Sequence, residues 1–142
     1  MATNGRSYAR FTPGAFGAWQ QQSFTSLSLN DPAISAATAD PDGDGQSNNF
    51  EFTAGLSPLD AQSRFLQTMQ NVPGQPAQMR LQIAPRLTDR TYVIESSPTL
   101  GLSANWQPLT SFTTSDAGNV RTITDLSATG AAKFYRVRIT VP

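Results

Sequence analysis

The second half of the chain alternates apolar and polar positions in short runs that predict β-strands. In 133–141, Tyr135, Val137 and Ile139 are separated by mostly polar neighbours, which is the period-two pattern of a half-buried strand. Further strands are expected at 64–70, 79–84, 91–96, 106–113 and 119–125. Turn residues separate these runs. Short strands with close turns predict an antiparallel β-sandwich of about six to seven strands.

The first third of the chain carries helix signals instead. Thr12 followed by Pro13 is a helix start, with Thr as the N-cap and Pro in the first turn. Phe16, Trp19 and Phe24 would then share one face. A second helix is expected over Asn48–Ala54, closed by Gly55 and blocked by Pro58. The segment 30–39 contains Pro and Asn-Asp and has no helical periodicity, so we do not expect it to form a helix that leads into residue 40.

These patterns divide the chain near residue 60. The length of 142 residues suits one domain, or one domain with a small module. We expect 1–60 to form a helical segment and 61–142 to form the β-sandwich, packed together as one unit. The predicted fold class is therefore mainly β, with the sandwich preceded by a small helical segment.

The composition excludes several classes of catalytic site, metal site and covalent cross-link. The chain has no His and no Cys, which excludes Ser-His-Asp and Cys-His catalysis, the usual zinc sites and disulfides. The formal net charge of zero argues against a nucleic-acid partner. No apolar run approaches the roughly 18 residues of a membrane span. We therefore expect neither an enzyme of these classes nor a membrane-spanning protein.

Charge is distributed unevenly along this neutral chain. Residues 11–63 contain six acids and no base. Four of the acids, Asp40, Asp42, Asp44 and Glu51, fall within the twelve residues 40–51. Dense acid in a Gly-rich context without a local base indicates a cation site, or else a solvated acidic turn.

The segment 40–51 matches the calcium-loop pattern D-x-[DN]-x-[DN]-G-x5-E at every specified position. Calcium prefers six to eight oxygen ligands, which alternate residues of a tightly turning loop supply, and Gly45 allows the sharp turn. Mg²⁺ fits less well because it demands rigid octahedral geometry. The predicted ligands are the carboxylates of Asp40, Asp42 and Asp44, the backbone carbonyl of Gln46, Asn48 directly or through a water, and both oxygens of Glu51.

The calcium loop stands alone in the sequence. Paired EF-hands carry an apolar residue at loop position 8, where this chain has Ser47. There is no second acidic loop, and 115–119 is predicted to be only a turn. A solitary loop is expected to be a structural clamp, because a calcium sensor needs a pair of helices that can open.

The loop resembles the calcium loops of thrombospondin type 3 repeats and of dockerin modules. More specifically, DPDGDGQSNNFEFTAGLSP at 40–58 resembles the "DPDGDGLSNLLEYALGLDP" pattern near the C-termini of large secreted bacterial proteins. Other matching features of that family are Trp19 and Phe24 upstream, and Tyr92–Ser97, Trp106 and Phe134–Arg138 downstream. The resemblance implies a terminal accessory module of an exported, extracellular or cell-surface protein, cut from a longer precursor. Cohesin binding is not expected, because a dockerin needs duplicated loops.

Three functions follow from these observations. The favoured one is a non-catalytic, extracellular calcium-binding structural module, whose ion clamps the helical part to the β-sandwich. A second is a self-assembling subunit of an extracellular filament or surface layer, suggested by the low charge (14% of residues). A third is a carbohydrate-binding accessory module that meets a cell-surface polymer.

Two residues of the predicted strands could carry other chemistry. Trp106 could stack on a sugar, but we expect it to fill the core of the sandwich. Glu95 could be half of a catalytic carboxylate pair. A cross-strand ion pair of Glu95 with Arg136 or Arg138 is the simpler expectation.

Overall fold

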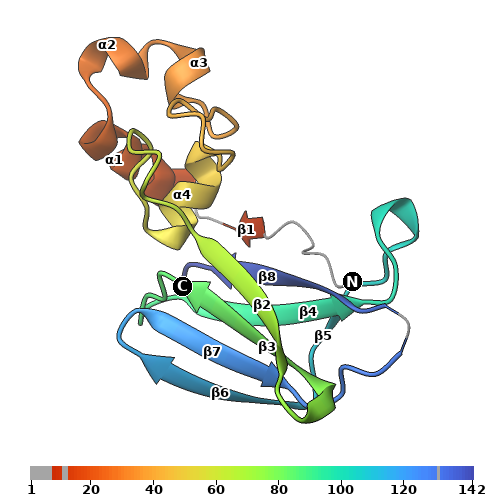
Figure 1. The fold of residues 1–142 in the computed structure, drawn as a ribbon. Coiled ribbons are helices and arrows are strands. Elements are labelled where there is room, and N and C mark those ends of the chain that lie inside the picture. Colours follow the sequence, from red (N-terminus) through yellow and green to blue (C-terminus); the bar gives the residue numbers. More distant parts are fainter. Residues whose placement is uncertain (1–7, 11–12, 131) are drawn as a thin grey trace. The chain divides into compact units, whose positions relative to one another are not determined.

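The computed structural model describes residues 8–10, 13–130 and 132–142 (Figure 1). Its helices are α1 (Pro13–Ser23), α2 (Ser26–Leu29), α3 (Pro32–Ser35), α4 (Asn48–Ala54) and the 3₁₀ turn η1 (Gly101–Ser103). Its strands are β1 (Tyr8–Arg10), β2 (Leu66–Val72), β3 (Gln75–Ala84), β4 (Thr91–Ser97), β5 (Gln107–Pro108), β6 (Phe112–Ala117), β7 (Val120–Asp125) and β8 (Phe134–Thr140).

The strands form two four-stranded sheets, in the orders β1-β8-β4-β5 and β2-β3-β7-β6. In the second sheet β3 pairs antiparallel with β2 and β7, and β6 pairs antiparallel with β7. In the first sheet β4 pairs antiparallel with β5. The fold is therefore mainly β, with two antiparallel sheets and a few short helices, an arrangement consistent with the expected β-sandwich.

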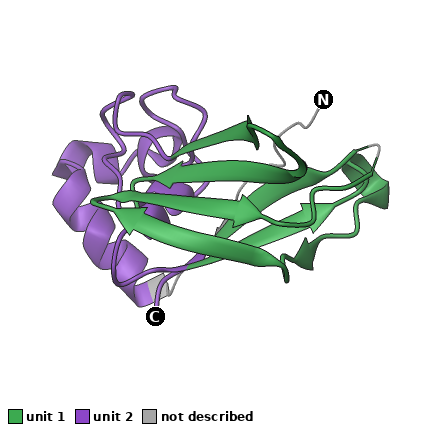
Figure 2. Cartoon of the chain, turned by 60° about the horizontal axis from the view of Figure 1, so that its bottom comes forward, with its two compact units in different colours: residues 1–8, 66–86, 92–138 green, residues 9–65, 87–91, 139–142 purple. Residues whose placement is uncertain are grey.

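The chain divides into two compact units (Figure 2). The strand-rich unit comprises residues 1–8, 66–86 and 92–138, and the helical unit comprises 9–65, 87–91 and 139–142. The helical unit thus contains α1 to α4 together with two short returns of the chain. That the helical and β parts pack as one unit stays a prediction.

Both sheets contribute to the core of the strand-rich unit. Leu81 and Ile83 of β3, Ile123 of β7, and Tyr135 and Val137 of β8 are completely buried. The period-two pattern of β8 is confirmed, because its odd-numbered residues from 135 to 139 are buried and the intervening ones are not. Burial of alternating residues from several strands is what holds such sheets together.

Trp106 is not the core residue that we expected. Tyr135 is the largest fully buried side chain. Trp106 is half-buried, and the guanidinium carbon of Arg136 lies 4.5 Å from the centre of its ring. Trp106 directly precedes β5, a two-residue strand at the end of its sheet. A side chain at a sheet edge stays partly in contact with solvent, which explains the difference.

Most strand predictions are confirmed to within a few residues, but the strand at 106–113 is wrong. The structure has two strands there, β5 in one sheet and β6 in the other. The N–H of Leu109 still donates to the carbonyl of Ile94 in β4, at 2.8 Å, whereas the carbonyl of Ser111 already accepts from the N–H of Leu126 next to β7, at 2.9 Å. The chain therefore passes from one sheet to the other between Leu109 and Ser111. The predicted turn at 115–119 is also shorter, because β6 continues to Ala117.

The two predicted helices are confirmed as α1 and α4, although Thr12, the predicted N-cap, lies outside the described residues. Phe24 follows the end of α1 but still packs on Trp19, with ring centres 5.8 Å apart. The expectation that 30–39 forms no helix leading into the loop is confirmed, because this described segment holds only the single turn α3, which ends at Ser35. Its N-cap Asp31 and first-turn Pro32 act locally, so one turn forms without any apolar periodicity.

Candidate metal centre

The acidic loop is shaped by hydrogen bonds from its own backbone. The N–H groups of Gly43 and Gly45 both donate to the carboxylate of Asp40, each at 2.9 Å. Gly43 has φ of 75° and Gly45 has φ of 92°, a backbone region that L side chains rarely adopt. The glycines therefore allow the chain to wrap around the Asp40 carboxylate.

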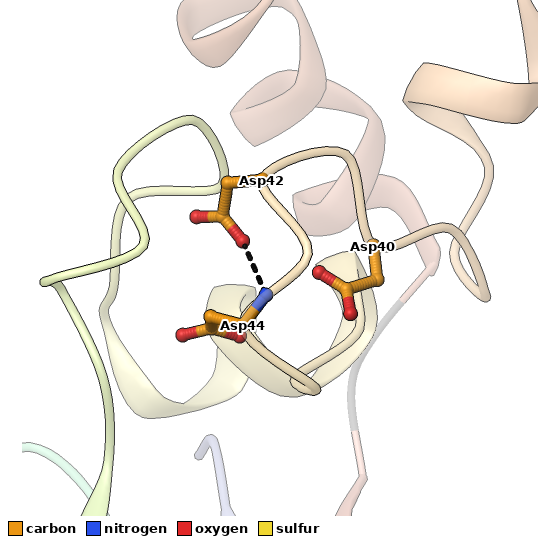
Figure 3. A group of neighbouring side chains, drawn as sticks. All are labelled: Asp40, Asp42 and Asp44. Atoms are coloured by element: carbon orange, nitrogen blue, oxygen red, sulfur yellow. Dashed lines mark hydrogen bonds between the residues drawn. The ribbon is translucent and has the colours of Figure 1, made fainter.

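The same loop brings three carboxylates together. One oxygen from each of Asp40, Asp42 and Asp44 lies within 4.8 Å of the others, so the group could hold a metal ion (Figure 3). Asp42 accepts from the N–H of Asp44 at 3.2 Å, and Asp44 accepts from the N–H of Gln46 at 2.7 Å. The second oxygens of Asp42 and Asp44 are buried without a hydrogen-bond partner.

Glu51, on the helix that follows the loop, is completely buried. Neither of its carboxylate oxygens has a hydrogen-bond partner in the structure. Burial, followed by the charges of Asp42, Asp44 and Asp40, raises its pKa to about 8. A buried carboxylate costs free energy unless it is paired. A bound cation would therefore reduce the free-energy cost of burying the Glu51 carboxylate.

Helix α4 holds Glu51 in place through its first turn. Ser47 caps the helix and accepts from the N–H of Phe50. The N–H groups of Asn48 and Asn49 bond to carbonyls of the segment before the loop, at 2.8 and 2.9 Å. The chain on either side of the loop is thereby joined, which fixes the start of α4 relative to the aspartates.

The buried face of α4 provides a second anchor. Phe52 packs against Phe16 and Trp19 of α1, with ring centres 5.5 and 5.8 Å away. Phe50 packs on Phe65 at 5.8 Å. These aromatic contacts lie inside the helical unit, so the packing of α1 against α4 also supports the position of Glu51.

Asn48 is suited to the ligand position predicted for it. Its side-chain amide nitrogen donates to the carbonyls of Ile34 and Ala36, at 2.7 and 2.8 Å. Its amide oxygen, by contrast, is buried and has no hydrogen-bond partner. The nitrogen therefore fixes the amide in place and leaves the oxygen available as a ligand.

Gln46 has a role that the motif did not indicate. Its side chain donates to the carbonyl of Phe65 at 3.2 Å and accepts from the N–H of Phe65 at 2.9 Å. The loop is thus tied to the residue before β2. The prediction that Gln46 binds the ion through its backbone carbonyl stays a prediction.

Asn49 was missed by the sequence reasoning. Its side-chain oxygen is also buried without a partner. It occupies loop position 10, where the calcium motif specifies no residue, so the sequence held no signal for it. The structure therefore shows a buried, unpartnered oxygen at Asn49 that the sequence did not indicate.

The other buried carboxylates of the described chain are neutralised, unlike those of the loop. Glu95 pairs with both Arg136 and Arg138, at 2.7 and 3.3 Å, which confirms the predicted cross-strand pair. Asp125 pairs with Lys133 at 2.6 Å and accepts from the Tyr135 hydroxyl at 2.7 Å. None of the ion pairs found among the described residues includes an acid of the loop.

Comparison of the chain with family models, characterised proteins and solved structures found no significant match. Within the described residues, no helix has the length and apolar character required to cross a bilayer. The acidic loop is therefore the feature from which we infer a function.

Proposed function

We propose that the chain is a non-catalytic calcium-binding structural module of a secreted or cell-surface bacterial protein. The observation that carries this proposal is completely buried Glu51, whose two oxygens have no hydrogen-bond partner and whose pKa is raised by burial and by the charges of the three converging aspartates. Such a site is unfavourable when empty, because the carboxylates repel one another and are removed from water. A bound cation turns both costs into stabilising interactions.

Calcium is the ion that this donor set fits. All the candidate groups are hard oxygen donors: carboxylates, the amide oxygen of Asn48 and the backbone carbonyl of Gln46. Calcium accepts six to eight such oxygens in flexible geometry, whereas Mg²⁺ prefers a strict octahedron and keeps its waters. Glu51 would close the shell with both oxygens, as the predicted position 12 requires.

The ion's role in this proposal is stability. It would join the loop to α4 through Glu51, and the bond from Gln46 to Phe65 extends the same tie to the start of the strands. We propose in addition that calcium clamps the helical part to the β-sandwich. A site filled at 100 times its dissociation constant adds about 2.7 kcal/mol to the free energy of unfolding.

Thermal unfolding in EDTA and in millimolar calcium tests the proposal. We expect calcium to raise Tm by roughly 5–10 °C, and magnesium at the same concentration to raise it less. Glu51→Gln keeps the size of the side chain but removes its charge, so this variant should lose most of the calcium response.

Asp60→Asn is the matched control. It also removes one acid from the helical unit, and its amide oxygen can still accept the hydrogen bond that Asp60 receives from Gln62. This variant should respond to calcium like the unmodified chain. An unchanged Tm in calcium for the unmodified chain would show that the loop is an ordinary acidic turn.

A further inference from the structure

Strand β6 forms an open edge of its sheet. It is the last strand in the order β2-β3-β7-β6, and Figure 1 shows it at the margin of the sheet. All six of its residues are exposed, including Phe112 at 42%. Within the described residues, β7 is the one strand that pairs with it. An edge of this kind presents unpaired backbone groups to another strand.

The register identifies which backbone groups point outward. In antiparallel pairs, alternate residues of an edge strand bond to the neighbouring strand and the others face away from it. The N–H of Leu126 donates to the carbonyl of Ser111 at 2.9 Å, and a two-residue turn closes the hairpin between Ala117 and Val120. Odd-numbered residues therefore bond to β7. The outward-facing N–H and C=O groups are those of Phe112, Thr114 and Asp116.

This edge lacks the usual protection against pairing. Natural edge strands are commonly guarded by Lys, Pro, bulges or uncompensated charge. β6 contains no Lys or Pro, its pairing with β7 shows no register shift, and its first three residues, Phe112, Thr113 and Thr114, are strand formers. Its one charge, Asp116, is bound by Arg121 at 2.7 and 2.9 Å and by Arg86 at 3.3 Å. The charge is thus compensated within the molecule.

We propose that two copies of this chain associate through β6, antiparallel about a two-fold axis at Thr114. The outward-facing groups are evenly spaced around this residue, so the edge is complementary to itself. Thr114 of each copy lies opposite Thr114 of the other, and Phe112 lies opposite Asp116 of the other. The sheet β2-β3-β7-β6 of one copy and the same sheet of the other copy then form one continuous sheet.

Electrostatics does not oppose a second copy as the occupant of this self-complementary edge. The formal net charge of zero produces no long-range repulsion between copies. In the self-paired register the two Asp116 side chains are about 13 Å apart along the strands, because four residues separate each from the other's partner position. Neither the net charge nor repulsion between the two Asp116 carboxylates therefore opposes pairing.

Sedimentation velocity over a range of concentrations, in calcium, tests the dimer with Thr114→Pro and Thr114→Val. Proline at 114 removes an outward N–H from each copy and leaves the bonds between β6 and β7 in place. Valine keeps the backbone donor and the size of the side chain. We expect the unmodified chain and Thr114→Val to form dimers as concentration rises, and Thr114→Pro to weaken dimerisation roughly 100-fold.

A second variant covers the case in which Thr114→Pro does not fold, which circular dichroism would show. Thr114→Lys places two like charges opposite each other at the axis, and it should shift the dimer to monomer with a relief by added salt. A monomeric unmodified chain up to millimolar concentration overturns the proposal. So does a dimer that is unaffected by Thr114→Pro or Thr114→Lys in a folded chain. Growth to species larger than a dimer would also overturn it, because it would indicate pairing of β6 with another edge.

Discussion

Glu51 is the side chain on which burial and charge repulsion in the acidic loop act together. Its carboxylate has no exposure to solvent and no hydrogen-bond partner, yet it lies close enough to Asp42 and Asp44 for their charges to raise its pKa. Without an ion, the folded chain reduces this cost by holding a proton on Glu51. With an ion, the ionised form is favoured instead.

The proton on Glu51 leads to a pH dependence in EDTA. Burial and the neighbouring acids raise its pKa from 4.5 to about 8. Between these pH values the folded chain holds a proton that the unfolded chain has released. The free energy of unfolding should therefore decrease as pH rises through this range, by up to a few kcal/mol.

Urea denaturation at pH 5.5 and 8.5 measures this dependence, with Glu51→Gln as the comparison. The variant cannot ionise at position 51, so its stability should change less between the two pH values. Calcium should reverse the trend in the unmodified chain, because ion binding requires ionised ligands. Equal pH dependence of the variant and the unmodified chain in EDTA would contradict the assignment.

At the scale of elements, Gly55 ends helix α4 and so defines the end of the segment that carries Glu51. Its φ of 74° lies in the left-handed region, and a Cβ at this position would collide with Leu87 Cδ1. Gly55→Ala should therefore lower the free energy of unfolding by about 1–3 kcal/mol, combining backbone strain with overpacking.

Gly74→Ala separates the two contributions. Gly74 has nearly the same φ, 73°, but a Cβ added there would have no heavy atom of another segment within 4 Å. Chemical denaturation of both variants should show the smaller loss for Gly74→Ala, about 1 kcal/mol from backbone strain alone. Equal losses would mean that Leu87 moves aside without cost.

The elements also show how far the sequence determines the structure. The alternation in β8 and the cap signals of α4 arise from neighbouring residues, so both elements could be predicted. The break between β5 and β6 could not, because it depends on which sheet each segment joins after Pro108. Half-burial of Trp106 has the same origin, since its place at a sheet edge is a property of the topology.

In the candidate site, too, the features that could be predicted are those that arise from neighbouring residues. The motif identified the three aspartates because their convergence is local to one turning loop. The side-chain bonds of Gln46 depend on Phe65, which lies 19 residues further along the chain, and burial of the Asn49 oxygen depends on the folded packing. Neither could be inferred from spacing alone.

At the scale of the whole molecule, the clamp predicts that the two units gain stability together. The chain has two Trp residues, Trp19 in the helical unit and Trp106 in the strand-rich unit. Trp106→Phe leaves a fluorescent reporter in the helical unit, and Trp19→Phe leaves one in the strand-rich unit. If calcium clamps the units, both reporters should show the same rise in Tm.

The two tryptophan reporters also distinguish a clamp from an effect of calcium on one unit alone. A rise in Tm for Trp19 alone would confine the effect of calcium to the helical unit and refute the clamp. Calorimetry of the unmodified chain gives an independent check, because units clamped by calcium should unfold in one transition when calcium is bound.

The side-chain bonds of Gln46 to Phe65 have a consequence for how the loop can evolve. When a residue binds calcium through its backbone carbonyl, the ion places no requirement on the side chain, which can therefore be substituted. Here the amide supplies both the donor and the acceptor that Phe65 requires. Glutamate would offer only acceptors when ionised, and asparagine is one methylene shorter. The hydrogen bonds with Phe65 thus restrict which residue can occupy position 46, although calcium binding through the backbone carbonyl would not.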